Sequence, residues 1–133
     1  MRVLVACEFS GVLRDAFRAR GHDAVSCDLL PTEADGPHHQ GDVRELLQPG
    51  RWDLMVAHPP CTYLCLSGAR WLYSEHGRFD KMRDAAKFFL DLWNAPVPRI
   101  CIENPVMHGH AKRSVGVRWS QHIQPWMFGH PES

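Results

Sequence analysis

Three apolar runs in this sequence each end at residues that could do chemistry. The runs and the residues that follow them are Met1–Ala6 before Cys7–Gly11, Leu54–Ala57 before His58–Cys61, and Ile100–Ile102 before Glu103–Pro105. In an open parallel sheet with helices between the strands, the carboxyl ends of the strands lie along one edge, where ligands bind. A thiol, a carboxylate and a glycine turn would therefore face one crevice, which favours an enzyme.

Cys61 is the candidate nucleophile. It follows Pro59 and Pro60, whose rings stiffen the backbone and would hold the thiol just beyond a strand. A free thiol with a pKa of ~8.5 is mostly protonated at neutral pH and needs a cationic neighbour to become a thiolate. Arg70 is the candidate cation. A cysteine after two prolines is by itself more often structural, and the other two strand ends are what favour catalysis.

Glu103 is the candidate acid, because it stands at the end of a strand expected to be buried. Burial favours the protonated form of a carboxylate, so Glu103 could hold or donate a proton near neutrality. The alternative is a carboxylate that accepts bonds from backbone amides or pairs with an arginine.

A cofactor site is predicted near the start of the chain. Phe9, Ser10 and Gly11 lead into a helix whose N-terminus could receive an anionic or polar cofactor group. Asp28 ends the second strand, where an acidic residue of nucleotide-binding α/β folds accepts bonds from ribose hydroxyls, at close to the usual spacing of ~20 residues. Asp42 could approach an adenine edge or cap a short helix, and capping is the simpler interpretation.

Three pairs of side chains raise the question of a metal site. They are His38 with His39, His108 with His110, and Cys61 with Cys65. None has the paired Cys and His spacing of a zinc site. Hydrogen-bonding histidines are the simpler interpretation, so no metal is predicted.

Hydrophobic periodicity predicts the elements that must position these residues. Strands are expected at Val3–Cys7, Ala24–Cys27, Leu54–Ala57 and Arg99–Glu103. Helices are expected at Gly11–Arg20, Val43–Gln48 and Arg78–Asn94. The intervening segments Leu29–Gly41 and His58–Gly77 are expected to be loops, the second long enough to suggest a functional role. Such an alternation of strands and helices implies right-handed crossovers and a parallel sheet.

The same patterns predict which side chains face inward. The first helix is expected to bury Val12, Leu13, Ala16 and Phe17 and to turn its arginines, Arg14 among them, toward solvent. Cys27 and Cys101 lie in apolar runs and are expected to be buried. From Met107 onward the pattern is poor, and Trp126–Phe128 is expected to remain exposed in a chain that looks short at its C-terminus.

The totals bound the class of protein. The 133 residues support one domain with a moderate core, and the formal net charge of zero gives nucleic-acid binding no overall help. No apolar run approaches the ~20 residues of a membrane span, and no signal peptide is evident. Five cysteines, an odd number, suggest reduced thiols in the cytoplasm. We expect one Rossmann-like α/β domain over residues 1–133, with a mostly parallel sheet and helices on both faces.

Several of these residues occur in the order of the motifs of a known family. They are Phe9-Ser10-Gly11, Asp28, Gly41-Asp42, Pro59-Pro60-Cys61 and Glu103-Asn104. Their order resembles that of the DNA cytosine-5 methyltransferases, and the segments Cys7–Pro31 and His58–Leu72 look like the small, phage-type members. The resemblance covers most of the chain from Met1 to about Met107. It implies a class I S-adenosylmethionine-dependent methyltransferase fold.

The resemblance also implies roles for individual residues. Cys61 would attack C6 of a cytosine in DNA, so that C5 takes a methyl group from S-adenosylmethionine, while Glu103 would contact N3 and the exocyclic amine. The cofactor would lie against Phe9–Gly11, with Asp28 on its ribose and Asp42 near its adenine. The same comparison implies further contacts, with the cofactor at Pro59 and with the substrate at Pro60, Arg70 and Asn104. A cytosine within a duplex would have to be flipped out of the stack.

Three features of the family's pattern are not found in this sequence: the later arginine-containing motif, the C-terminal motif that completes the cofactor pocket, and a target-recognition domain. Two alternatives therefore stay open. One is C5 modification of a free pyrimidine nucleotide, which the neutral charge suits. The other is a catalytically incomplete nucleotide-fold module that works through a partner chain or a second copy, bound by its aromatic C-terminal tail.

Overall fold

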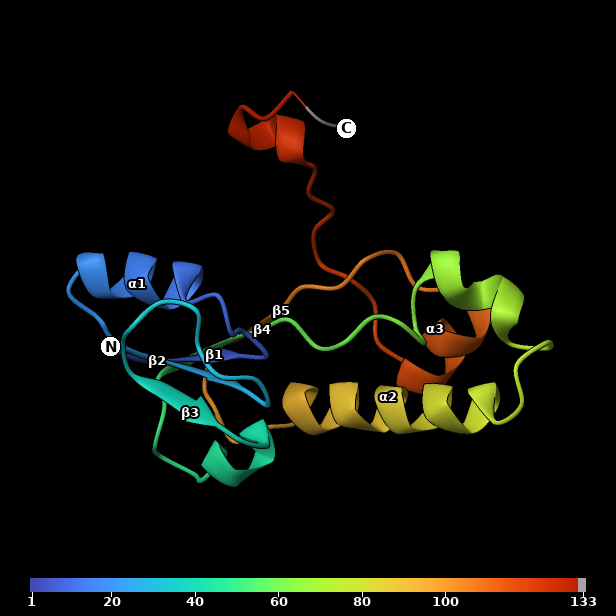
Figure 1. Ribbon diagram of the computed structural model, residues 1–133, viewed down its shortest axis with the longest axis horizontal. Helices are drawn as coiled ribbons and strands as arrows, with labels where there is room; N and C mark the ends of the chain where they lie inside the picture. The colour runs from blue at the N-terminus through green and yellow to red at the C-terminus, as the bar shows by residue number, and fades with distance from the viewer. Residues whose placement is uncertain (132–133) are drawn as a thin grey trace.

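The computed structural model describes residues 1–131 (Figure 1). Its strands are β1 (Arg2–Ala6), β2 (Asp23–Asp28), β3 (His38–Gln40), β4 (Leu54–Ala57) and β5 (Ile100–Ile102). Its helices are α1 (Val12–Ala19), α2 (Arg78–Trp93) and α3 (Gly109–Val115), with short 3₁₀ helices η1 (Val43–Leu46), η2 (Leu66–Trp71) and η3 (Pro125–Phe128). Within residues 1–131, every helix is too short or too polar to cross a lipid bilayer.

The five strands form one all-parallel sheet in the order β3-β2-β1-β4-β5. From β1 the chain moves outward through β2 to β3, and then returns to place β4 on the other side of β1. The order therefore reverses between β1 and β4, which is the position where open α/β sheets bind ligands at the carboxyl ends of their strands. The predicted α/β class with a parallel sheet is confirmed, and the arrangement is compatible with a Rossmann-like fold.

The predicted strands agree with β1, β2, β4 and β5 to within a residue or two at each end, because each is built mainly on an apolar segment. The strand β3 was not predicted and lies within the segment expected to be a loop. Its three residues, His38–Gln40, are polar, so neither an apolar run nor an alternating pattern marks them. They become a strand because the neighbouring strand β2 offers unpaired backbone groups at Ser26–Asp28.

The helix α1 lies where it was predicted, but two of its side chains point the other way. Val12 was expected to be buried and is 73% exposed, whereas Arg14 was expected to face solvent and is fully buried. Leu13 and Phe17 pack on the sheet as predicted. The buried face is rotated toward Arg14 because the segment after β2 packs beside the helix and supplies hydrogen-bond acceptors for its guanidinium.

The other face of the sheet is covered by η1 and by the C-terminal half of α2, which contribute Leu46 and Leu92 to a core with Leu4 and Met55. The N-terminal half of α2 extends beyond the sheet and packs on α3 and on Leu64 and Leu72, which flank η2, forming a second cluster (Figure 1). The sequence predicts an apolar stripe at Phe79, Met82, Ala86, Phe89 and Trp93. Met82, Ala86 and Phe89 are buried as expected, whereas Trp93, at the end of the helix, is 43% exposed. These two clusters make the molecule elongated, with the sheet at one end and the small helices at the other (Figure 1).

Of the two cysteines predicted to be buried, Cys27 is buried and Cys101 is exposed. The prediction for Cys101 is wrong because β5 is an edge strand. Alternate residues of a strand point to opposite faces of the sheet. The helix α1 covers one face at β1 and β2 but does not extend over β5.

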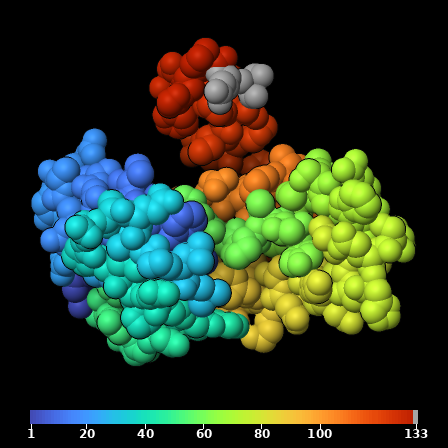
Figure 2. Space-filling model, in the orientation of Figure 1, coloured from blue at the N-terminus to red at the C-terminus, as the bar shows by residue number. Residues whose placement is uncertain are grey.

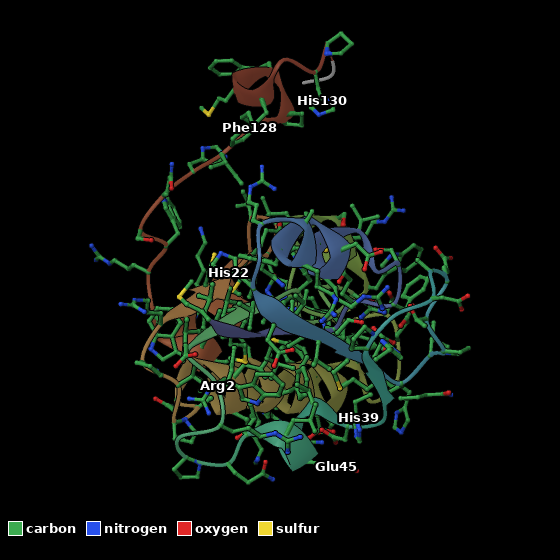
Figure 3. The ribbon with its side chains drawn as sticks, turned by 90° about the vertical axis from the view of Figure 1, so that its left-hand side faces the viewer. Arg2, His22, His39, Glu45, Phe128 and His130 are labelled. Carbon is green, nitrogen blue, oxygen red and sulfur yellow. The ribbon has the colours of Figure 1, made fainter. Side chains whose placement is uncertain are left out.

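The segment after Met107 contains α3 and η3, neither of which was predicted. His108 caps α3 by accepting the Ala111 N–H, and the helix then buries Ala111 and Val115 against α2. The short helix η3 stands apart from the body of the molecule in both views (Figures 1 and 2). Figure 3 shows the labelled Phe128 and His130 at this distal position. The predicted exposure of Trp126–Phe128 is confirmed, at 58% for Trp126 and 68% for Phe128.

Candidate active site

The residues that follow β1, β4 and β5 lie side by side at the carboxyl edge of the sheet. Backbone hydrogen bonds continue the strand pairing past the last strand residues: Glu8 N–H donates to Cys27, His58 N–H to Ala6, and Glu103 N–H to Ala57. The donor-to-acceptor distances are 3.1, 3.0 and 3.0 Å, respectively. This edge includes the reversal between β1 and β4.

Two side-chain contacts join the loop after β4 to the segment after β5. His58 Nδ1 lies 3.4 Å from Glu103 Oε2, and Asn104 Nδ2 donates to the Pro59 carbonyl at 3.1 Å. Pro60 follows and lines a hollow of about 380 Å³ with Tyr63 and Phe88. The segment that carries Cys61 is therefore tied to the segment that carries Glu103.

The Cys61 thiol is partly buried and has an acidic neighbour. Burial, the nearby Cys65 and the Glu103 carboxylate all raise the pKa of Cys61. Arg70, the predicted cation, instead stacks its guanidinium on the Trp71 ring with 4.7 Å between the guanidinium carbon and the ring centre.

The expected burial of Glu103 is wrong, since 50% of its side chain is exposed. The reason is the place of β5 at the edge of the sheet, where the strand has one neighbour and ends after three residues. The partner of Glu103 is His58, not the backbone amide or arginine considered as the alternative. The carboxylate is therefore open to a ligand that approaches from solvent.

Glu8 caps the start of α1 and is a residue that the sequence did not single out. Its carboxylate accepts the N–H groups of Leu13 at 2.7 Å and Arg14 at 3.3 Å, and also the Ser10 hydroxyl at 3.1 Å. The expected anion site at this helix N-terminus is therefore already occupied by a protein carboxylate. A glutamate a few residues before a predicted helix could have indicated this cap, because a carboxylate placed there accepts the unpaired N–H groups of the first helical turn.

The turn Phe9–Gly11 passes from β1 to α1 with Gly11 at a φ of 80°, in the left-handed region. A Cβ at Gly11 would come within 2.5 Å of the Arg14 guanidinium. The close approach of Arg14 is therefore enough to explain why position 11 needs a glycine. Phe9 is exposed beside the turn, and its carbonyl accepts the Glu33 N–H at 2.8 Å.

Asp28 and Asp42 lie close to Cys7, on the β2 and β3 side of the edge. Burial raises the pKa of Cys7 to about 12, and the charges of both carboxylates add to this shift. Asp28 accepts the Leu30 N–H at its Oδ1 atom. Asp42 accepts the Arg44 N–H and is the N-cap of η1, so the capping interpretation is confirmed. Three further hydrogen bonds, from the Arg44 side chain, lower the pKa of Asp42.

The predicted site residues thus form two groups on one edge. The first group, at the ends of β1 to β3, contains Phe9, Ser10, Gly11, Asp28 and Asp42. The second group, at the ends of β4 and β5, contains Pro59, Pro60, Cys61, Glu103 and Asn104. Arg70 lies in η2, away from both groups. In Figure 2 the green segment after β4 lies at the middle of the molecule, beside the blue and cyan N-terminal third.

The histidine pairs considered as metal ligands are engaged in other bonds. His38 contacts Ser26 and the Leu30 carbonyl, and His108 contacts the Tyr63 carbonyl and the Ala111 N–H. Among residues 1–131, no three His, Cys, Asp or Glu side chains are grouped in a way that could hold a metal ion.

All five cysteines are unpaired thiols.

The chain was compared with family models, with curated proteins and with solved structures, and none of the three comparisons found a match.

Proposed function

We propose that this chain is a class I methyltransferase that transfers a methyl group from S-adenosylmethionine to C5 of cytosine in DNA. The observation that carries the proposal is the pair of contacts, His58 to Glu103 and Asn104 to Pro59, that brings the candidate thiol and carboxylate to one edge of the sheet. The candidate cofactor group lies along the same edge, beyond the strand-order reversal. An α/β enzyme with two substrates is expected to bind its cofactor on one side of this reversal and the reacting base on the other.

The chemistry of the residues at β1 and β2 fits a nucleoside cofactor without phosphates. Dinucleotide-binding folds hold a pyrophosphate on unpaired N–H groups at a helix N-terminus. Here Glu8 already accepts those N–H groups, so a phosphate would meet a negative charge. Asp28 accepts the Leu30 N–H at Oδ1 and can accept a ribose hydroxyl at Oδ2. S-adenosylmethionine, when bound, supplies an electrophilic methyl group.

Cys61 acts as the nucleophile in the proposed reaction. Its sulfur, after losing the thiol proton, bonds to C6 of the ring, and the electron pair of the C5–C6 double bond moves to C5, which takes the methyl group. Loss of the C5 proton then restores the double bond, and the Sγ–C6 bond breaks with its electrons returning to Cys61.

Glu103 stabilises the ring as charge develops, through hydrogen bonds to N3 and the exocyclic amine. A bond to N3 requires the protonated carboxyl. Because half of the Glu103 side chain is exposed, the burial that favours this form must come from the substrate ring itself. Asn104, held on the Pro59 carbonyl, keeps the two segments together around the base.

The test is transfer of labelled methyl from S-adenosylmethionine to cytosine-containing DNA, with Cys61→Ser as the matched variant. We expect label in DNA with the wild type and none with Cys61→Ser, while calorimetry gives both proteins the same affinity for the cofactor. Turnover retained in Cys61→Ser would exclude the thiol mechanism.

Free pyrimidine nucleotides are the second candidate substrate, and the formal net charge of zero is the observation that favours them. The same assay with dCMP and CMP distinguishes the two. Label in a nucleotide but not in DNA would replace DNA as the substrate and leave the roles of Cys61 and Glu103 unchanged.

A role as a partner-binding module is the third candidate, favoured by the exposed Trp126, Met127 and Phe128 on η3. If neither DNA nor nucleotides are labelled, and the chain nevertheless binds the cofactor or self-associates through this segment, the module is the better description.

A further inference from the structure

The segments that carry Cys61 and Glu103 lead from the edge of the sheet to the small helices η2 and α3. They are joined on the way, because the Leu66 N–H donates to the Val106 carbonyl at 3.0 Å and an isolated antiparallel bridge lies next to this bond. Figure 1 shows η2 and α3 together at the end of the molecule away from β3. This end therefore adjoins the candidate active site, and a polymer bound at that site would extend onto it.

The solvent-facing side of α3 and the segment that follows it carry positive charge. Lys112 and Arg113 lie on the helix and Arg118 just beyond it, and all three side chains are exposed. Residues 104–131 contain no Asp or Glu. None of the three cations forms an ion pair with a carboxylate of residues 1–131. The chain, whose formal net charge is zero, thus has an uncompensated positive patch here.

Two exposed cations of α2 have different surroundings. Arg83 lies 2.9 Å from a carboxylate oxygen of Asp80, and Lys87 lies 3.0 Å from one of Asp91. These pairs form because the carboxylates stand three or four positions away on the same helix. The sequence of α3 has no carboxylate at such spacings, so an anionic ligand could bind its cations without breaking an ion pair.

Aromatic side chains lie among the cations of α3. Lys112 Nζ is 5.8 Å from the centre of the Trp119 ring, which is exposed. The Arg113 guanidinium donates to His110 Nδ1 at 3.0 Å, and His110 Nε2 lies 3.0 Å from the hydroxyl of the exposed Tyr73. Cations that alternate with exposed rings are typical of surfaces that bind single-stranded nucleic acid, where phosphates meet the cations and bases stack on the rings.

We propose that the α3 surface, formed by Lys112, Arg113, Arg118 and Trp119, binds the DNA strand beside the target cytosine. The three cations contact phosphates, and an unpaired base stacks on the Trp119 ring. The inference rests on the proposed function, because it names where the DNA substrate of that reaction is held. A formal net charge of zero does not oppose such binding, since screening limits each charge to about 10 Å and the local patch decides.

The test is binding of a fluorescent, cytosine-containing single-stranded oligonucleotide by the full chain, without methyl donor and over a range of salt concentrations. The α3 double variant combines Lys112→Ala with Arg113→Ala. We expect it to bind about tenfold or more weakly at ~0.1 M salt, because two phosphate contacts are lost. The slope of log affinity against log salt should become shallower by about 1.4, or roughly 0.7 for each contact.

The matched control is the α2 double variant, which combines Arg83→Ala with Lys87→Ala and removes the same charge from paired positions. We expect its affinity and slope to stay close to those of the wild type. Equal losses in the two double variants would show that net charge alone governs binding, and would overturn the inference. Wild-type affinity in the α3 double variant would overturn it as well. Urea unfolding checks that both variants are folded.

Trp119→Ala tests the ring separately from the charges. We expect affinity for the oligonucleotide to fall by about fivefold or more while the salt slope stays the same, because no charge is removed. Unchanged affinity would overturn the stacking role of Trp119. Vesicles of phosphatidylserine and phosphatidylcholine are the competing anionic surface. Binding of the wild type to these vesicles but not to DNA would overturn the assignment to DNA.

Methyl transfer separates this inference from the proposed function. In the α3 double variant we expect a higher KM for DNA with little change in kcat, because the cations hold the substrate away from the reacting atoms. Transfer by the wild type with an unchanged KM in this variant would overturn the α3 surface and leave Cys61 as nucleophile. Binding of DNA through the α3 surface without any transfer would overturn the proposed function and leave the binding surface in place.

Discussion

Cys7 has a backbone conformation that residues with a side chain rarely adopt, with a φ of 60°. Such a conformation persists only where the neighbouring structure holds it. Here the Glu8 N–H is bonded to the Cys27 carbonyl, and the Glu8 carboxylate is bonded to the start of α1. The turn at Cys7 therefore lets the Glu8 carboxylate bond to the start of the helix, and it sets the partly buried Cys7 thiol near Asp28.

Asp28→Ala tests the proposed cofactor site at the scale of one side chain. We expect S-adenosylmethionine to bind more weakly by about 1.5–3 kcal/mol, the range for a hydrogen bond to a charged group. Asp23→Ala is the matched control, because Asp23 begins the same strand at the opposite edge. Calorimetry measures both, and equal affinities in the two variants would place the ribose elsewhere.

Among the elements, the segment Leu29–Gly41 is held in place by a side chain of α1. The Arg14 guanidinium donates to the Ala34 carbonyl at 2.8 Å and to Thr32 and Ser26 at 3.1 Å. Its charge is paired with Asp15 at 2.8 Å. The helix, the end of β2 and the segment that leads to β3 are thereby joined, and the candidate cofactor residues on them keep a fixed separation.

Arg14→Ala should destabilise the fold strongly, by about 3–5 kcal/mol, because it leaves buried acceptors without donors. Urea unfolding gives the free energy. Arg18→Ala, on the same helix, removes a half-exposed arginine that pairs with Asp23 at 3.7 Å and should cost less than about 1 kcal/mol. Similar losses in the two variants would show that Arg14 does not hold the segment.

Across the whole molecule, charged side chains and exposed apolar side chains are unevenly distributed. Residues 104–131 contain Lys112, Arg113 and Arg118 and no carboxylate, although the chain as a whole has no formal net charge. The same stretch ends in η3, whose Trp126, Met127 and Phe128 are exposed away from the body (Figure 3). Exposed apolar residues grouped in this way are typical of interaction surfaces.

Replacing Trp126 and Phe128 together by alanine should leave the free energy of unfolding within about 0.5 kcal/mol of the wild type, because neither side chain is packed in a core. We expect the same change to reduce self-association in sedimentation equilibrium. Leu29→Ala, an exposed apolar residue on the other part of the molecule, is the control and should leave association unchanged. A wild type that is monomeric at every concentration would exclude binding between copies through η3.

Most elements could be located from the amino-acid sequence alone. The strands β1, β4 and β5 were predicted from continuous apolar runs, β2 from the mostly apolar segment Ala24–Cys27, and α2 because its apolar side chains recur every three or four residues. The N-cap at Asp42 was also predicted, since a cap is a contact between near neighbours. The sequence also indicated that Cys61 and Glu103 each follow a strand.

Which side chains are buried, and which candidate residues meet, depends on how the elements pack together. The order of strands put β5 at an edge, which exposes Cys101 and Glu103, and the packing of the Leu29–Gly41 segment buried Arg14. Tertiary packing also pairs the polar residues His38–Gln40 with β2 as the strand β3, and it brings Asn104 into a hydrogen bond with Pro59. The physical reason is that periodicity records what a residue's nearest neighbours along the chain do, whereas strand order and loop packing depend on residues far away in the sequence.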